Sequence, residues 1–254
     1  MKRLLLLPAL LALGAHSAAE ETKSKFIRFA EEEASDSLQT AVVTYESPQQ
    51  VQVDLVGAVH IADKAYFDGL NTRFKTYDAV LYELVGPPME ERVEGIDYQA
   101  KNFVHADMNM KQFTKTQETK KESFLTLYLK AVQAQKSANA KKGLDSDTAG
   151  LVMLLKVFTA KDSSSGLKRM IAQEFDSVED IMAGVEAGDG TVLVGERNRV
   201  ALEVMDKQIA AGKRRLAIFY GAAHLADMEE RLLKKGFKRT QTEWLKAWNL
   251  PHEE

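Results

Sequence analysis

The chain has 254 residues, of which 45% are hydrophobic and 28% are charged, as is typical of one globular domain with a substantial core. Its net charge of -3 provides no basic surface for a phosphate backbone, so we expect no nucleic-acid partner. Cysteine is absent, which excludes disulfides, thiolate nucleophiles and thiolate metal sites. Any bound metal ion must therefore take imidazole and oxygen ligands.

The first 19 residues have the pattern of a signal peptide. Lys2 and Arg3 form a short positive region, an apolar run follows at 4–13, and small residues at 17–19 suit cleavage before Glu20. The run is short for a membrane span, and an uncleaved anchor is the alternative. We therefore expect an exported protein, periplasmic or secreted, whose mature chain (20–254) is a single α/β domain without a stable membrane span.

Two strands joined by a turn are predicted next. Residues 38–45 are rich in Thr and Val, Ser-Pro at 47–48 favours a turn, and apolar residues alternate over 51–55. The second strand leads into Gly-Ala-Val-His-Ile-Ala-Asp at 57–63, which contains His60. Apolar spacing predicts a helix over 64–76, with Asp63 placed to cap it.

A short buried strand is predicted over 79–85, and Glu83 is its one charged residue. A buried carboxylate requires a cation, a donor or a metal ion, because leaving it unpaired is costly. A solvent-facing position on an edge strand, or a buried pair with an arginine, is the alternative. Strand, helix and strand form a right-handed βαβ unit, which places Glu83 at the same edge of the sheet as His60.

The pattern from 93 to about 189 is mainly helical, with apolar faces near 124–132, 151–158 and 167–175. We expect this insertion to cover or flank the crevice at the edge of the sheet. His105 lies within it, and its surroundings leave open whether it belongs to a site.

A long helix is predicted from Gly195 to a stop at Gly212. In its polar first turn, Arg197 is suited to present a fixed cation to the crevice and Asn198 a neutral donor. Arg199 is expected to face solvent, and a wholly solvated turn is the alternative.

A second buried strand, at 216–220, leads into Gly-Ala-Ala-His-Leu-Ala-Asp at 221–227, which contains His224. Asp227, with Glu230 three residues later, is expected to cap the next helix. The closing segment at 237–248 alternates loosely and is expected to join the sheet as an edge strand.

Gly-Ala-x-His-x-Ala-Asp therefore occurs twice, each time between a buried strand and a helix. In an open α/β sheet the strand ends and helix amino termini share a crevice where ligands bind. Either histidine alone is most simply a structural residue, but their repetition favours a shared site. Two imidazoles, from His60 and His224, together with Glu83 suit a first-row divalent ion with open positions for water.

Four separated segments together resemble the TraB/GumN family, which includes the TIKI proteases. They are the first Gly-x-x-His, the glutamate in VLYELV, the helix start GERNRVAL, and the second Gly-x-x-His in IFYGAAHLADMEERL. The resemblance spans about 51–237. It implies the α/β fold shared with the erythromycin esterase and ChaN-like proteins. That fold would have a central mixed, largely parallel sheet, flanking helices, and a mostly helical insertion between the two Gly-x-x-His halves.

The resemblance also implies a site. His60, Glu83 and His224 would be the metal and catalytic centre, holding Mn²⁺ or Co²⁺ rather than Zn²⁺, with Arg197 and Asn198 as the matched helix-start residues. Two departures stand out. Many relatives have aspartate where this chain has Asn198, and this chain has no transmembrane helix at its carboxyl end.

We therefore expect an exported metal-dependent hydrolase, a TIKI-like metallopeptidase that cleaves an amide bond in a peptide or protein. The ion would activate water and polarise a carbonyl, Arg197 or Asn198 would stabilise the oxyanion, and Glu83 would be a ligand or the general base. Two other classes stay open. One is a non-catalytic binder of peptide or haem, as among pheromone-shutdown and ChaN-like relatives. The other is a degenerate member whose polar cluster is structural. The sequence does not indicate the substrate or the oligomeric state.

Overall fold

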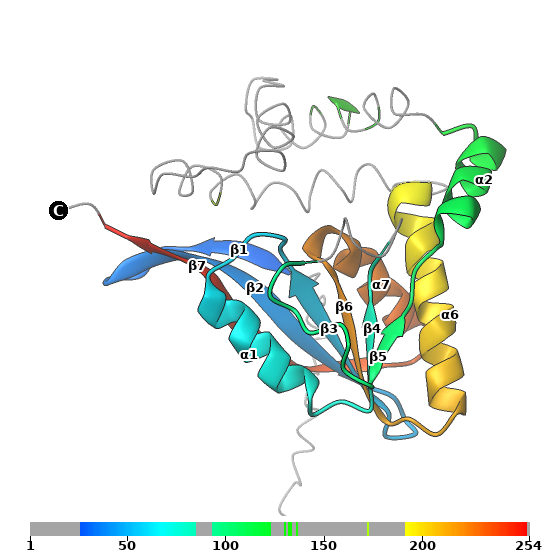
Figure 1. Ribbon diagram of the computed structural model, residues 1–254, viewed down its shortest axis with the longest axis horizontal. Coiled ribbons are helices and arrows are strands. Elements are labelled where there is room, and N and C mark those ends of the chain that lie inside the picture. Colours follow the sequence, from blue (N-terminus) through cyan, green and yellow to red (C-terminus); the bar gives the residue numbers. More distant parts are fainter. Residues whose placement is uncertain are drawn as a thin grey trace, which may run out of the picture.

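The computed structural model describes residues 26–84, 93–122 and 191–252, with the single positions 130, 132, 133, 136 and 172. The expected α/β fold is confirmed, because helices flank a seven-stranded mixed sheet (Figure 1). The elements in chain order are β1 (Ile27–Ala30), β2 (Ser35–Glu46), β3 (Gln52–Ala58), α1 (Lys64–Phe74), β4 (Ala79–Tyr82), β5 (Phe103–His105), α2 (Met110–Lys120), the π-helical turn η1 (Val192–Glu196), α6 (Arg197–Ala210), β6 (Arg215–Gly221), α7 (Ala222–Lys234) and β7 (Lys238–Pro251).

The sheet is antiparallel on one side and parallel on the other. β2 pairs antiparallel with β1, β3 and β7, whereas β3, β6, β4 and β5 form a parallel row in that order. The predicted βαβ unit therefore joins strands that are not neighbours, since β6 lies between β3 and β4. The carboxyl ends of β3 and β4 still lie at one edge, as expected, because both strands run parallel to β6.

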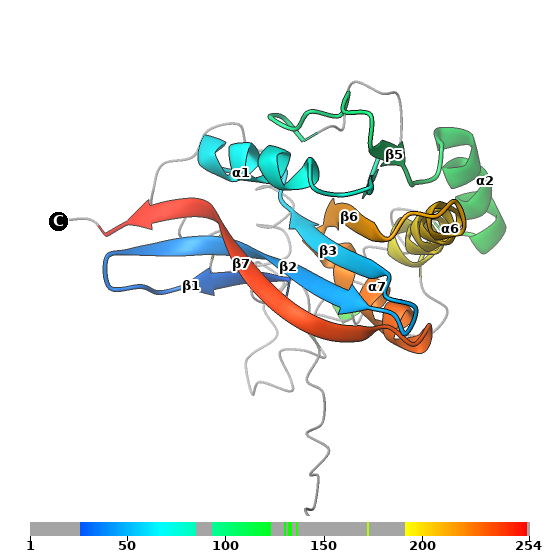
Figure 2. The ribbon, with the colours of Figure 1, turned by 90° about the horizontal axis from the view of Figure 1, so that it is seen from below.

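Helices α1 and α7 lie on opposite faces of the sheet, as Figure 2 shows. Side chains along β2 contact one helix or the other. The Thr40 hydroxyl lies 3.0 Å from that of Tyr66 in α1, and the Tyr45 hydroxyl donates to Glu229 in α7 at 2.8 Å. Apart from Gln52 and Asp54 in β3 and Arg215 at the start of β6, both strands are apolar, as expected for strands whose two faces are buried.

The predicted edge strand is confirmed as β7, which pairs with β2 along the full length of β2 and has two register shifts. β7 occupies one edge of β2 throughout, so β1 and β3 share the other edge. The two ends of the described chain are therefore joined through β2.

The first part of the predicted helical insertion is not helical. Residues 93–109 form turns and the short strand β5, and α2 begins only at Met110. The helices expected near 124–132, 151–158 and 167–175 lie almost entirely outside the described residues, as does the predicted signal peptide. No helix among the described residues is long and apolar enough to cross a membrane.

The predictions for the two aspartate caps also need correction. α7 begins at Ala222 with Gly221 as its N-cap, so Asp227 lies inside the helix and caps nothing. Asp63 occupies the N-cap position of α1 as predicted, but its side chain makes no capping hydrogen bond. It accepts instead from the Asn249 N–H of β7 at 2.8 Å.

Candidate functional site

The carboxyl ends of β3 and β6 define a topological switch point. Ala58 and Gly221, the last residues of these two strands, are direct partners. From there the chain continues to α1 on one face of the sheet and to α7 on the other (Figure 2). Open α/β sheets bind ligands at such a divergence, because the departing segments leave a crevice between them.

Glu83 lies at this edge, one residue beyond β4. Its Oε2 accepts from the Gly221 N–H at 2.7 Å, and its Oε1 accepts from Arg197 Nη2 at 2.6 Å. Burial by itself raises the pKa of Glu83. The electrostatic attraction of a protonated His224 and of Arg197, with the Gly221 hydrogen bond, outweighs it and lowers the pKa to about 2. Glu83 is therefore ionised at neutral pH.

Arg197, the first residue of α6, forms a two-point ion pair with Asp107. Its Nε donates to Oδ1 at 3.1 Å and its Nη2 donates to Oδ2 at 2.6 Å. The Asp107 carboxylate is fully buried and also accepts from the N–H groups of Leu84 and Met108. One guanidinium thus joins the segments that follow β4 and β5.

Asn198 fixes the orientation of His224. Its Nδ2 donates to the His224 carbonyl at 2.9 Å and to Asp227 Oδ2 at 2.7 Å, which uses both amide hydrogens. Its Oδ1 therefore faces His224 Nδ1, 2.7 Å away, and Nδ1 is the donor. Since both amide hydrogens of Asn198 are used, Arg197 is the better placed of the two residues that the sequence offered as oxyanion donors.

The remaining ring nitrogen of His224 faces Glu83. Burial lowers the pKa of this imidazole, so at neutral pH the ring is uncharged, with its proton on Nδ1 and a lone pair on Nε2. Nε2 lies 3.5 Å from Glu83 Oε1. A lone pair and a carboxylate oxygen that face each other across this distance form an electron-rich position suited to a proton or a metal cation.

Glu83, Arg197, Asn198 and His224 form one connected group, the Glu83 cluster, and His60 is not part of it. His60 is exposed in the loop after β3, and no hydrogen bond or ion pair joins it to Glu83, Arg197 or His224 among the residues described. The two Gly-Ala-x-His segments differ because the first is drawn toward β7. The Asp63 N–H donates to the Ala247 carbonyl at 2.8 Å and the Trp248 indole N–H to that of Ile61 at 2.7 Å, whereas His224 continues directly into α7.

The two glycines of these segments serve different purposes. A Cβ on Gly57 would lie 3.1 Å from the Phe26 carbonyl oxygen and 3.3 Å from that of Ala41, so close packing of the backbone requires glycine there. At Gly221 a Cβ would make ordinary contacts with Glu83 and His224. The role of Gly221 is to donate its N–H to Glu83.

Sequence reasoning missed Asp107 and Tyr220. Asp107 follows β5, and its position as the first acidic residue beyond a strand end is the only local signal for it. The Tyr220 hydroxyl donates to the Ala106 carbonyl at 2.5 Å, and its ring packs edge-on against His224. His105, left open by the sequence, donates its Nε2–H to the Leu84 carbonyl at 2.8 Å and so supports the chain beside Glu83.

Within the described residues, no group of three or more His, Asp and Glu side chains is arranged to hold a metal ion. Glu83 and His224 supply two suitable donors, and Arg197 and Asn198 hold these two in place. No family model, curated protein or solved structure matches the chain.

Proposed function

We propose that this protein is an exported metal-dependent hydrolase of the TraB/GumN type that cleaves an amide bond in a peptide or protein. The neutral Nε2 of His224, held 3.5 Å from the ionised Glu83 at a topological switch point, is the observation that carries the proposal. A divalent ion, Mn²⁺ or Co²⁺ by the resemblance, would be held by His224 and Glu83. The resemblance adds His60 as a third ligand, and in this structure His60 lies apart from them in the exposed loop after β3. The ion would supply an activated water and polarise the scissile carbonyl.

The chain's own groups have separate tasks in this proposal. Glu83 stays anionic because Arg197 and the Gly221 N–H stabilise its charge. Asn198 and Asp227 hold the His224 ring in one tautomer, so Asn198 is a positioning residue. Arg197 donates to Glu83, Asp107 and more weakly the Leu193 carbonyl, which leaves one N–H for a substrate oxygen.

The proposal is tested by peptidase activity and bound metal in the purified chain, before and after dialysis against a chelator. Wild type should cleave a casein-derived peptide mixture with Mn²⁺ or Co²⁺ present, lose activity with the metal, and regain it on re-addition. The double variant His60→Ala/His224→Ala should be inactive. His252→Ala is the matched control and should retain full activity, because His252 lies at the end of β7 and pairs with Asp36.

Full activity in the double variant would reject the proposal. Two other outcomes would assign the chain a different function. Peptide held intact with metal present, or a histidine-dependent Soret band on haem titration, would indicate a binder. An unchanged melting temperature with chelator, together with no bound metal, would indicate a structural cluster.

A further inference from the structure

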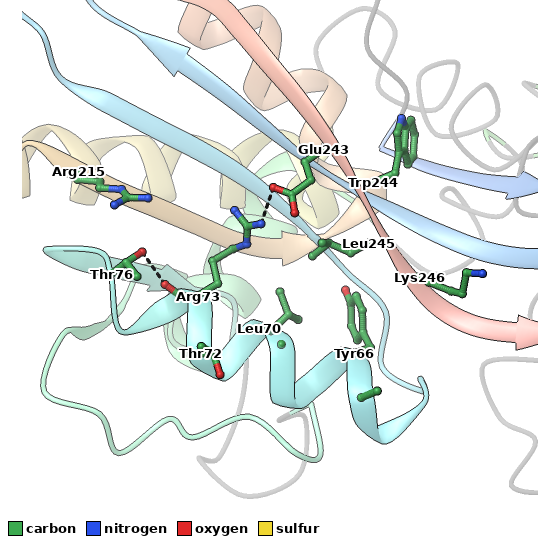
Figure 3. A pocket seen from close by; sticks show the side chains of 12 residues that line it. Tyr66, Leu70, Thr72, Arg73, Thr76, Arg215, Glu243, Trp244, Leu245 and Lys246 are labelled. Carbon is green, nitrogen blue, oxygen red and sulfur yellow. Dashed lines mark hydrogen bonds and ion pairs between the residues drawn. The ribbon is translucent and has the colours of Figure 1, made fainter.

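A groove lies between α1 and β7 (Figure 3), and none of its lining residues belongs to the Glu83 cluster. It has a volume of about 570 Å³, within the usual range for ligand sites. Ala65 of α1 and Leu245 of β7 give it apolar surface, and Tyr66 and Leu70 lie buried behind its α1 wall. The ion pair of Arg73 in α1 with Glu243 in β7 spans the two walls and fixes their separation.

One wall of this groove is the backbone edge of a strand. The four consecutive residues 243–246 of β7 all contribute to the lining, although alternate side chains of a strand point to opposite faces. β2 occupies the other edge of β7. In the described part of the chain, β2 is the one strand that pairs with β7, so no strand lies along the groove edge of β7 over 238–246.

The same edge is already paired at one end of the groove. The loop before α1 lies along β7 there, with Asp63 N–H donating to the Ala247 carbonyl and the Asp63 carboxylate accepting from the Asn249 N–H, each at 2.8 Å. The edge of β7 is thus able to pair with an extended segment, and the groove continues from the point where this loop turns into α1.

The lining of the groove carries more positive than negative charge. Its lining contains Arg73, Arg215 and Lys246 against the single carboxylate of Glu243. Lys246 pairs with Glu32 at 3.1 Å, whereas Arg215 lies over the Tyr77 ring and has no carboxylate within ion-pair distance among the described residues. Cationic side chains on an edge strand also discourage pairing with another copy of the same edge.

We propose that this groove binds an extended peptide that carries an acidic side chain. The peptide adds to β7 as a strand through backbone hydrogen bonds over 238–246. Alternate side chains enter the groove beside Gly69 and Leu245, and the acidic one pairs with Arg215. Strand addition of this kind takes its affinity from the backbone and its selectivity from side-chain pockets. The groove lies outside the Glu83 cluster, so the proposal does not depend on hydrolysis.

The test is fluorescence anisotropy with a blocked, labelled peptide of about nine residues, the length that matches 238–246. The peptide alternates valine and threonine around a central aspartate. Gly69→Trp should weaken binding by about tenfold or more, since Gly69 lines the groove and a Cβ there meets nothing within 4 Å. Gly69→Ala is the matched control and should bind as wild type does. Arg215→Gln should remove the preference for aspartate over asparagine in the peptide.

Two further measurements test the backbone pairing. A peptide with methylated backbone amides should not bind. Peptide should slow hydrogen exchange over 238–246 and leave β5 unchanged, whose outer edge likewise pairs with no strand among the described residues. No binding of any peptide, or binding insensitive to both Gly69→Trp and backbone methylation, would overturn the proposal. A dimer that protects 238–246 without peptide would overturn it too and assign the groove to a second copy of the chain.

Discussion

At the scale of single residues, the Arg197–Asp107 pair makes the clearest stability prediction. Asp107→Ala leaves a buried guanidinium with Glu83 as its one carboxylate partner among the described residues and removes the acceptor of two backbone N–H groups. We expect a loss of about 3–5 kcal/mol in the free energy of unfolding, measured in urea. Glu203→Ala is the control and should cost less than about 1 kcal/mol, because its pair with Arg199 is exposed. Equal losses in both variants would contradict the burial assigned to Asp107.

The lowered pKa of Glu83 predicts a loss of stability in acid. Its pKa in the folded chain is about 2, below its ordinary value of 4.5, so the folded state binds its proton less readily than the unfolded state. This contribution is fully present above about pH 4.5 and disappears as the pH falls toward about 2. The free energy of unfolding should therefore fall more steeply over this interval in wild type than in Glu83→Gln. Parallel curves would show that Glu83 is not held as an anion.

At the scale of elements, two glycines predict opposite effects of the same substitution. Gly212 follows α6 with a φ of +92°, whereas Gly69 is an exposed position inside α1. A Cβ added at either glycine would meet no atom within 4 Å, so only backbone preference separates the two positions. Gly212→Ala should destabilise by about 1–2 kcal/mol, and Gly69→Ala should stabilise by up to about 1 kcal/mol. Thermal unfolding of both variants measures the difference, and a shift of the same sign in both would contradict these conformations.

The elements that the sequence predicted well are those with strong local patterns. The hairpin of β2 and β3, the amphipathic α1 and the glycine stop of α6 follow from alternation, helical spacing and residue type over short distances. β5 was missed because three residues carry no usable period. The beginning of α7 was misplaced because nothing local distinguishes Gly221 from Gly57. The difference between them depends on the contacts of Asp63 and Trp248 across the sheet.

For the candidate site, sequence predicted the edge of the sheet and four of the residues that lie there. Glu83, Arg197, Asn198 and His224 are together because strand ends and helix starts converge at that edge. Asp107 was not predicted because its pairing with Arg197 joins residues 90 positions apart. The sequence also did not predict that both amide hydrogens of Asn198 are already donated. One of them goes to Asp227, which the sequence suggested as a helix cap.

At the scale of the whole molecule, β7 joins the end of the described chain to the loop that carries His60. Trp248 is buried and its indole N–H donates to the Ile61 carbonyl, whereas Trp244 is half-buried beneath the Arg28 guanidinium. Trp248→Ala should therefore cost about 3–5 kcal/mol in urea unfolding. Trp244→Ala should cost about 1 kcal/mol. Similar costs for the two tryptophans would show that β7 does not hold this loop as described.

Binding of Mn²⁺ to the whole chain tests the central claim most directly, because it requires neither a substrate nor turnover. Free Mn²⁺ is counted by electron paramagnetic resonance as metal is added to wild type, His224→Ala and the control His252→Ala, with circular dichroism confirming that each is folded. We predict one bound ion per chain in wild type and control, and binding weakened by at least about tenfold in His224→Ala. Equal binding in all three proteins, or none in wild type, would contradict the assignment of His224 and Glu83 to a metal site.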